Sequence, residues 1–383
     1  TRRAVCSFSE AEKKCPFLPS SLWKWTEAVL KISKGHPVVS PLRRCNPPTS
    51  VRPLWRPDCK TAFQTASALW KRPHKPQQTM AERNISILIP CFNRFCAPLV
   101  KTLHDLAVAT KSPRDDAFNF EIIVADDKSS RVGCVEANRE INALPHCRLL
   151  EMDHNVGRAE IRNVLARNAC YEWLVFLDCD VNIPDSHFLQ NYLQCDERHE
   201  VVYGGVSLPP FGKRFHGNLR YRYEKRCLPK FSVENRLAQP YQSFRTCNFM
   251  VSKQTLLNHP FDGRIRTYGY EDVLFGKSLT AAHIPVHHID NPVEIDDFED
   301  NGNFMYKTEE AMQTLFRMRD LMDGYSLITH YSAKIDRWNM RRPLLLFFRR
   351  FGKMMRKSLR GKHPSVSVYN LYRLLYYLSL EDD

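Results

Sequence analysis

From Met80 onward, short apolar segments alternate with helix-like segments along the chain. Four segments are short and mostly apolar, which favours strands: residues 85–89, 121–125, 148–152 and 173–177. Helix-like segments lie between them, at residues 99–109, 135–143 and 157–169. Strands and helices at this spacing imply βαβ units. We therefore predict an α/β fold with a mostly parallel central sheet flanked by helices.

After residue 200 the pattern becomes weaker. Further strand candidates lie at residues 201–203, 247–251 and 286–289, and a helix is predicted at residues 308–322. Residues 209–241 are aromatic and basic without a clear period. We assign residues 80–310 to the α/β domain and residues 311–383 to a helical, basic C-terminal region.

Residues 1–79 differ from the rest in composition. They hold 10 of the 24 prolines and 4 of the 6 tryptophans, and they show no sustained period. Proline breaks regular structure repeatedly between residues 41 and 57. We expect residues 1–79 to be a basic, proline-rich extension that is poorly ordered or non-native, with the working protein beginning at Met80. The alternative is a basic arm that binds anionic partners.

The formal net charge of +14 is concentrated at the two ends of the chain. Residues 1–79 hold 15 Lys and Arg against 4 Asp and Glu, and residues 341–383 hold 10 against 3. The middle of the chain is therefore slightly acidic. This distribution argues against a nucleic-acid-binding protein, whose basic residues would form a patch on the main domain.

The cysteines are scattered and suggest neither a disulfide framework nor a zinc site. None of the 13 shows paired C-x-x-C spacing, and several lie in apolar surroundings, where a free thiol behaves as a small hydrophobe. We predict a reducing compartment. Because no apolar run reaches about 18 residues, we expect no membrane-spanning helix.

Three acidic groups fall at or near predicted strand ends: Asp126-Asp127, Asp178-Cys179-Asp180 and Glu271-Asp272. In open α/β sheets, ligands bind beyond the carboxyl ends of the strands. The Asp178 and Asp180 carboxylates follow a buried strand, and a divalent cation that also binds a nucleotide diphosphate would compensate their desolvation. The alternative is an aspartate pair that caps the following turn.

The helix at residues 157–169 opens with two arginines, Arg158 and Arg162, on one face. Two guanidinium groups beside a helix N-terminus form a candidate site for a diphosphate. The alternative is a solvated basic face beside the apolar side of the helix.

Five motifs occur together in one order: ISILIPCFNR, EIIVADDKSS, NVGRAEIRN, WLVFLDCDV and GYEDVLFG. In order and approximate spacing they resemble glycosyltransferase family two, the large inverting family with the Rossmann-like GT-A fold. The resemblance covers roughly residues 83–310. The later residues 288–292 and 303–307 resemble members that assemble bacterial polysaccharides.

The resemblance implies a role for each matching residue. Pro90 and Asn93 would line the nucleotide pocket, and Asp126 or Asp127 would bind the base. Arg158 and Asn163 would support the donor from the helix, and residues 245–249 would lie beneath the sugars. Asp178 would bind the ribose, and Asp178 and Asp180 would bind Mn²⁺ or Mg²⁺. Asp272 would be the general base, with Glu271 helping to hold the acceptor.

One position departs from the family pattern. Many relatives supply a histidine to the metal near Glu294–Asp296 of this chain, where no histidine stands. Three explanations remain open: Asp296 replaces it, His287 or His288 reaches the metal, or the metal has fewer protein ligands.

Residues 341–360 combine many basic side chains with a central apolar segment. Such a basic amphipathic segment is typical of proteins that lie on anionic membrane surfaces. The alternative is a helix that packs on the domain and exposes a solvated basic face. We expect a cytoplasmic protein, peripheral on the cytoplasmic membrane face.

Together these features predict a hexosyltransferase that moves a sugar with inversion from a nucleotide-diphosphate sugar, expected to be a UDP-sugar, to a glycan or lipid-linked saccharide. A dinucleotide oxidoreductase is disfavoured because no G-x-G-x-x-G follows the first strand. A nucleotidyltransferase is disfavoured because no Gly-rich, basic phosphate loop stands there. The remaining alternative is a catalytically inactive nucleotide-sugar or membrane-binding protein of the same fold.

Overall fold

A computed structural model describes residues 84–111, 118–210, 212, 215–322 and 324–380, which all lie in one unit of the chain, Gln77–Asp383. The predicted extension 1–79 lies outside the described residues.

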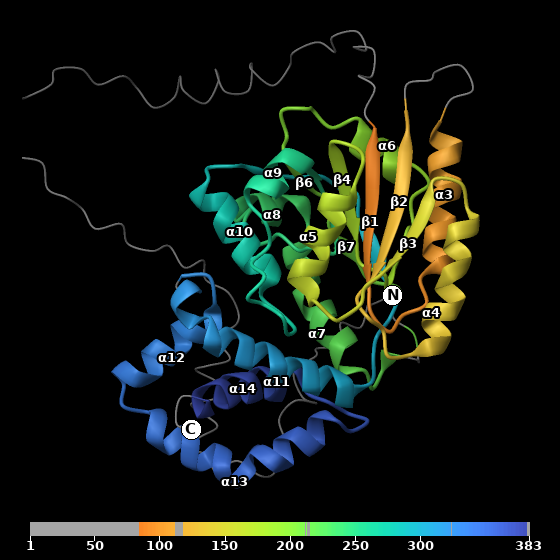
Figure 1. The fold of residues 1–383 in the computed structure, drawn as a ribbon. Coiled ribbons are helices and arrows are strands. Elements are labelled where there is room, and N and C mark those ends of the chain that lie inside the picture. The colour runs from red at the N-terminus through yellow and green to blue at the C-terminus, as the bar shows by residue number, and fades with distance from the viewer. Residues whose placement is uncertain (1–83, 112–117, 211, 213–214, 323, 381–383) are drawn as a thin grey trace, which may run out of the picture. The chain divides into compact units, whose positions relative to one another are not determined.

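The central sheet has seven strands among the described residues, in the order β3-β2-β1-β4-β8-β6-β9 (Figure 1). Their bounds are β1 Ile85–Cys91, β2 Phe120–Asp126, β3 Cys147–Glu151, β4 Trp173–Leu177, β6 Val201–Tyr203, β8 Asn248–Ser252 and β9 Val286–His288. The first four are parallel to one another, whereas β8 runs antiparallel to both β4 and β6. The predicted α/β class with a mostly parallel sheet is confirmed.

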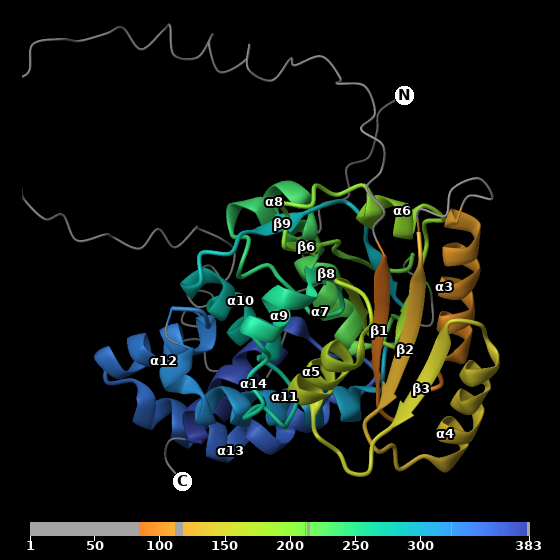
Figure 2. The same ribbon diagram turned by 45° about the horizontal axis from the view of Figure 1, so that its top comes forward.

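Helices cover both faces of this sheet (Figures 1 and 2). Alternate residues of β1 point to opposite faces, so Ile87 packs with α3 and α6 while Leu88 packs with α5, α9 and α10. These side chains are fully buried, as expected for strands covered on both sides. The helices are α3 Ala97–Thr110, α4 Val132–Asn138, α5 Arg158–Asn168, α6 Phe188–Leu193, α9 Lys253–Asn258 and α10 Glu271–Ala281.

A small second sheet lies next to the end of β4. It consists of β5 (Val181–Asn182), β10 (Val293–Ile295) and β7 (Val206–Ser207), with β10 between the other two. The pairing of β10 with β5 places the segment around residue 296 beside Asp180, whose carbonyl accepts a hydrogen bond from the Asp296 N–H at 3.3 Å. Residues far apart in sequence therefore meet at this edge.

The C-terminal region is helical, as predicted, and its helices pack on one another. They are α11 Asn301–Arg317, α12 Leu327–Arg337, α13 Arg341–Leu359 and α14 Val366–Ser379. The predicted helix 308–322 begins earlier, at Asn301, because the Asp300 carboxylate caps it by accepting from the N–H groups of Gly302 and Asn303. The predicted boundary at residues 310/311 falls inside α11.

Two helices occupy the segment where the sequence showed no period, α7 (Leu219–Cys227) and α8 (Val233–Ala238). Both are short, and α7 combines alternating basic and aromatic side chains, so neither gives a clear apolar stripe. Among the described helices none is long and apolar enough to cross a membrane. The described cysteines are free thiols.

Candidate active site

The carboxyl ends of β1, β2 and β4 meet at one edge of the sheet and bring the predicted acidic residues there. The pairing register sets Cys91 of β1 opposite Asp126 of β2. Asp178 follows directly after β4. Pro90 lies within β1, one residue before the end of the strand. This edge is where ligands bind in open α/β sheets.

Asp127 fixes the loop that leads into α5. Its carboxylate accepts from the N–H groups of Val156 (2.6 Å) and Gly157 (3.0 Å). Burial raises the pKa of Asp127, although these two backbone hydrogen bonds oppose the shift. Gly157 has φ of +88° and a Cβ there would lie 2.8 Å from the Arg266 carbonyl oxygen, so only glycine fits. Asp127 therefore positions the first turn of α5.

Asp126 and Asn93 connect the two neighbouring loops through Ser129. Asp126 accepts from the Ser129 N–H at 2.8 Å and from its Oγ at 2.5 Å. The Asn93 N–H donates to the same Oγ at 2.6 Å, and the Asn93 side chain accepts from the Arg131 N–H at 2.9 Å. Beside Asn93, Phe92 is 48% exposed, an aromatic ring at the end of a strand that the sequence analysis did not select.

Asn163 is engaged by the fold. Its amide donates to the Phe261 carbonyl at 3.0 Å and accepts from the Phe261 N–H at 3.0 Å. The side chain is buried and fastens the loop before α10 to α5. This geometry gives Asn163 a structural role. If Asn163 supports the donor as predicted, it does so indirectly, by holding α5 in position.

Two arginines and two carboxylates form a closed network at the start of α5. Arg162 Nη2 lies 2.7 Å from Asp178 Oδ1, and Arg158 Nε lies 2.9 Å from Glu271 Oε1. Arg158 Nη2 also lies 3.9 Å from Asp178 Oδ2. Although burial opposes it, the two guanidinium groups hold the pKa of Glu271 below its ordinary value. The charges of this network balance one another.

The proposed diphosphate role of the arginine pair is wrong for Arg162. Its side chain is 2% exposed, and its guanidinium is bound by Asp178 and by the Arg158 carbonyl. Arg158 is 39% exposed and stacks 5.0 Å from the centre of the Tyr268 ring. Only Arg158 of the two remains accessible to a ligand. The i, i+4 spacing placed both on one side of the helix, but the buried Asp178 partner could not be read from it.

Asp180 and Asp272 are the two carboxylates outside this balanced network. Among the described residues, the ion partner of Asp180 is Arg220, whose Nη1 lies 3.9 Å from Oδ2. Burial and then the charge of Asp178 raise the pKa of Asp180. A desolvated carboxylate whose ion partner is 3.9 Å away has the capacity to accept a further positive charge.

Asp272 lies in the first turn of α10, after a turn in which Gly269 and Tyr270 both have positive φ. Its Oδ1 accepts from the Val273 N–H at 2.8 Å. Burial and then the charge of Glu271 raise the pKa of Asp272 to about 6. A carboxylate with this pKa is ionised near neutral pH yet retains more affinity for a proton than an ordinary aspartate, which suits a general base.

The structure gives no support to the histidine explanation for the third metal ligand. His287 lies in β9 and stacks on His199 with ring centres 3.3 Å apart. His288 is buried, with Nε2 3.0 Å from the Pro240 carbonyl and Nδ1 3.4 Å from Arg236. Asp296 is exposed beside Asp180. No group of three or more His, Cys, Asp or Glu side chains within the described parts of the chain is arranged to hold a metal ion.

Three charged residues near Asp180 were not predicted from the sequence to belong to the site. They are Arg220 of α7, Glu299, which lies just before α11, and Lys307 of α11. Lys307 Nζ lies 2.7 Å from Glu299 Oε2, and Arg220 Nη1 lies 3.6 Å from Glu299 Oε1. These residues come from segments before and after residue 296. The pairing of β10 with β5 brings residue 296 to the site. In the sequence, Asp300, a typical N-cap residue, is the one indication that a turn precedes α11.

The family model described as Glycosyl transferase family 2 matches residues 86–259. Chondroitin synthase of Escherichia coli is 28% identical over 120 residues, 31% of this chain and 16% of that protein. An uncharacterized glycosyltransferase of Haemophilus influenzae is 35% identical over 96 residues, 25% of this chain and 29% of that protein. The chain thus spans less than a third of these curated relatives.

A solved mannosyltransferase from Pyrobaculum calidifontis, in complex with GDP-Man and Mn²⁺, aligns with a TM-score of 0.48 and 14% identity, covering 84% of this chain and 94% of that one. Residues 86–259 form a domain of glycosyl transferase family 2. The predicted family and its class of enzyme are thereby confirmed.

Proposed function

We propose that the chain transfers a hexosyl group, with inversion, from a nucleotide-diphosphate sugar to a glycan or lipid-linked saccharide. The observation that carries the proposal is the separation of charges at the sheet edge. Arg158 and Arg162 neutralise Asp178 and Glu271, which leaves Asp180 for the donor and Asp272 for the acceptor. The relative named chondroitin synthase supports a saccharide acceptor and a role in polysaccharide assembly.

Asp272 is the general base in this proposal. Its carboxylate takes the proton of the acceptor hydroxyl while the oxygen attacks the anomeric carbon from the side opposite the leaving diphosphate. One attack from that side inverts the configuration. Arg158, held by Glu271, stays partly exposed and stabilises the negative charge that develops on the leaving group. Glu271 acts by orienting Arg158.

The residues present fit a divalent cation that arrives with the donor. Mg²⁺ is commonly held by one or two carboxylates together with substrate phosphates and water, so a site without three protein ligands remains suitable. Asp180 is the carboxylate that would hold it, with Asp178 beside it fixed by Arg162. When bound, Mn²⁺ or Mg²⁺ would supply charge stabilisation for the diphosphate.

We propose that the nucleoside binds at the loops after β1 and β2. Asp126 is our choice for the contact with the uracil base, because its bonds to Ser129 keep it beside Asn93 and Phe92. Both Asp126 and Asp127 already accept hydrogen bonds at both oxygens, and Asp127 uses its pair to hold the start of α5, so the choice rests on the loop that each residue faces.

A panel of nucleotide sugars with Mn²⁺ or Mg²⁺ tests the proposal. We expect one UDP-hexose to release UDP in an acceptor-dependent manner, and NMR of the product to show the anomeric configuration opposite to that of the donor. Turnover of no donor with either ion would refute the function, and a product with retained configuration would refute the single-base mechanism.

Replacing Phe92 by Ala should weaken donor binding. Stacking of a base on an aromatic ring contributes about 1–3 kcal/mol, so we expect the KM for the donor to rise roughly 5- to 100-fold while kcat changes little. Val108→Ala, at an exposed position of α3, is the control. Steady-state kinetics at varied donor concentration measure both constants. An unchanged donor KM in Phe92→Ala would place the base elsewhere.

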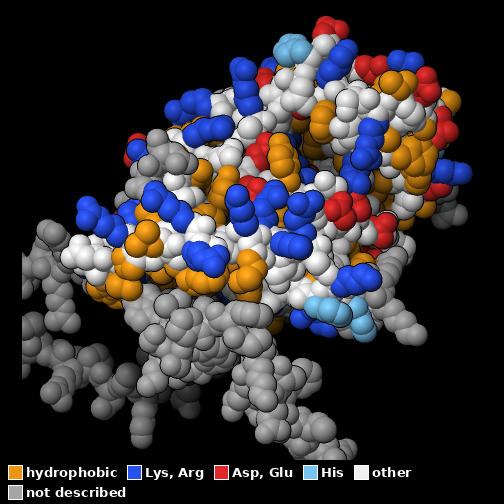
Figure 3. Space-filling model, turned by 90° about the horizontal axis from the view of Figure 1, so that it is seen from below, with side chains coloured by type: hydrophobic (Ala, Val, Ile, Leu, Met, Phe, Trp, Pro, Cys, Tyr) orange, Lys and Arg blue, Asp and Glu red, His pale blue; other side chains and the backbone are white. Residues whose placement is uncertain are grey.

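We also propose a peripheral contact between α13 and an anionic membrane surface. Helix α13 carries seven Lys or Arg and no Asp or Glu, and Figure 3, which views the molecule from below Figure 1, shows basic side chains gathered on this side. Leu345, Met355 and Leu359 of α13 are buried with residues of α14, whereas Leu346 and Met354 on the same helix are 65% and 48% exposed. The proposed contact is therefore mainly electrostatic, with these two apolar side chains able to reach the membrane interface. It would suit a lipid-linked acceptor and a place on the cytoplasmic membrane face.

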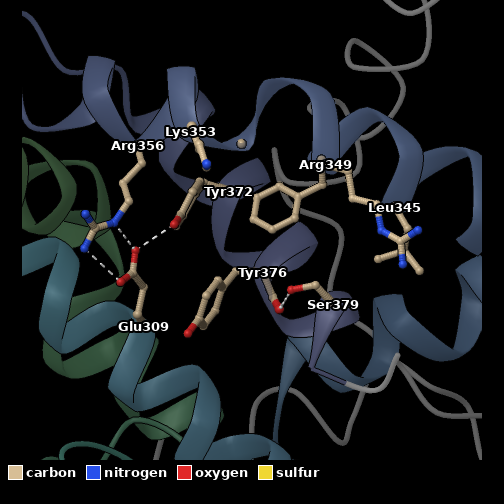
Figure 4. A pocket seen from close by; sticks show the side chains of 10 residues that line it. Glu309, Leu345, Arg349, Lys353, Arg356, Tyr372, Tyr376 and Ser379 are labelled. Carbon is tan, nitrogen blue, oxygen red and sulfur yellow. Dashed lines mark hydrogen bonds and ion pairs between the residues drawn. The ribbon is translucent and has the colours of Figure 1, made fainter. Parts of the chain in front are cut away.

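A pocket of about 410 Å³ beside α13 shows how its basic side chains are divided (Figure 4). Arg356 is bound by the Glu309 carboxylate, which also accepts from the Tyr372 hydroxyl. Lys353 lines the pocket and is exposed, and Arg350 and Lys357 are exposed on the same helix. The exposed cations of α13, rather than Arg356, are therefore those that would contact lipid phosphates.

Neutralising two of these cations should weaken membrane binding. Each Lys or Arg near an anionic surface contributes about 1 kcal/mol, so Arg350→Gln with Lys357→Gln should bind anionic vesicles roughly 30-fold more weakly. The matched control is Lys101→Gln with Lys111→Gln, two exposed positions at α3. Vesicle co-sedimentation at low and high salt measures the effect. Equal losses in both pairs, or binding that salt does not weaken, would contradict a specific electrostatic contact through α13.

A further inference from the structure

Arg220 forms only a long ion pair with Asp180. Its side chain is 15% exposed, and its Nη1 lies 3.9 Å from Asp180 Oδ2 and 3.6 Å from Glu299 Oε1. The hydrogen bond that the structure gives this guanidinium runs from Nη1 to the Asp297 carbonyl at 3.0 Å. A guanidinium has five N–H donors, so most of the hydrogen-bonding capacity of Arg220 is directed to neither carboxylate.

Glu299 is the second carboxylate near Arg220, with Oε1 3.6 Å from the same Nη1 that faces Asp180. The Glu299 side chain is 7% exposed, and its Oε2 is bound by Lys307 at 2.7 Å. Its other oxygen, Oε1, is buried without a hydrogen bond. The Arg220 guanidinium also lies 5.9 Å from the centre of the Phe298 ring. Arg220 is therefore close to two carboxylates and is hydrogen-bonded to neither.

The pair of Arg162 and Asp178 shows what a structural ion pair looks like in the same site. Those two groups are 2.7 Å apart, and the arginine is 2% exposed. Burying charge without close pairing costs free energy, so the longer contact of Arg220 is not explained by stability. A position near Asp180 that leaves donor groups unused suits a guanidinium that changes partner when a ligand arrives.

We propose that Arg220 is the counter-ion of Asp180 before the donor binds and becomes a ligand of the donor diphosphate when a divalent cation occupies Asp180. The inference rests on the proposed function. A cation at Asp180 would repel the guanidinium. A diphosphate offers it several charged acceptors in the geometry that guanidinium groups bind well. No bond is made or broken in this exchange, and Glu299 keeps Arg220 at the site throughout.

Titration of UDP at increasing Mn²⁺, followed by calorimetry, tests the exchange. In Arg220→Gln we expect UDP affinity at saturating Mn²⁺ to fall about 10-fold or more, while uridine binds as in wild type. Because Asp180 has lost its competing counter-ion, the Mn²⁺ concentration that gives half of the enhancement of UDP binding should be lower. Arg220→Lys keeps the charge but loses the fork of donors, so its loss of UDP affinity should be smaller.

Arg222→Gln is the matched control, since Arg222 lies on the same helix and is exposed. It should behave as wild type. The inference is overturned if Arg220→Gln keeps wild-type UDP affinity, or if UDP and uridine weaken equally, which a structural disturbance would produce. UDP binding by wild type and Arg222→Gln reports on the proposed donor site itself, so failure of that function is distinguished from failure of the role of Arg220.

Discussion

Asp272→Asn is expected to reduce kcat about 10²- to 10⁴-fold, the usual contribution of a positioned general base. The amide cannot accept the proton of the acceptor hydroxyl, whereas its size and position match those of the carboxylate. Donor binding should change little, because the donor is assigned to Asp180 and Arg158 and not to Asp272. Initial rates at saturating donor, together with calorimetric titration of UDP, separate the two effects.

The pH dependence gives a second readout for Asp272. Its pKa is about 6, so the wild-type kcat/KM should rise with pH through about 6 and then level off. The rising limb should be absent from the residual activity of Asp272→Asn. A variant that keeps the limb near pH 6 would show that another group is the base.

Asp272→Asn should also fold at least as stably as wild type at pH 7. The pKa of Asp272 rises from an ordinary 3.8 to about 6 on folding, so the folded state binds the proton more tightly than the unfolded state. The free energy of unfolding contributed by this group is therefore full below pH 3.8 and decreases as pH rises to about 6. A neutral amide avoids that loss. Thermal unfolding at pH 7 measures the stability of the variant. A Tm below that of wild type would indicate that the lost activity results from misfolding.

Asp180→Asn is the second substitution with a large expected effect. Asp180 is the carboxylate that is neither neutralised by an arginine at short distance nor committed to the fold by a described side-chain hydrogen bond. Loss of one preorganised charge in an active site typically lowers kcat about 10²- to 10³-fold, and we expect at least this loss. The enhancement of UDP binding by Mn²⁺ should disappear as well.

Stability again distinguishes function from folding. Burial and the neighbouring Asp178 raise the pKa of Asp180, so removing its charge should not lower the Tm at pH 7. Asp290→Asn, at an exposed site, serves as the control for a lost surface carboxylate. If Asp180→Asn keeps Mn²⁺-enhanced UDP binding, the cation lies elsewhere, and Asp296→Asn is the next variant to measure because Asp296 is beside Asp180.

The sequence predicted those parts of the site that follow directly from strand ends. Asp126, Asp127 and Asp178 are at the carboxyl edge because apolar runs of four or five residues end immediately before them. The alternation of strands and helices also predicted that these strands, β3, β2, β1 and β4, form a parallel sheet. The antiparallel β8 could not be read from its residues, since a short buried strand has the same pattern in either direction.

Residues that reach the site from elsewhere were hidden because their contacts depend on tertiary structure. Arg162 and Arg158 have the same type and helical face, yet one is buried against Asp178 and the other is partly exposed. Arg220 lies in a helix without an apolar stripe, and it meets Glu299 only through the folding of a segment some 80 residues later. Sequence spacing contains no information on either contact.

Helix α11 bears on both the proposed active site and the C-terminal helices. Lys307 on this helix binds Glu299, while the next two residues face the other way: Thr308 is 3.0 Å from the Tyr369 hydroxyl and Glu309 binds Arg356. The C-terminal helices therefore pack against α11 and support the proposed active site, and they are not a separable membrane-binding segment. Truncation after residue 340 would remove α13 and α14, which pack on α11. Membrane attachment can therefore be studied by surface substitution but not by truncation. A fusion or transplant that preserves activity must carry residues 260–380 along with the family domain at residues 86–259.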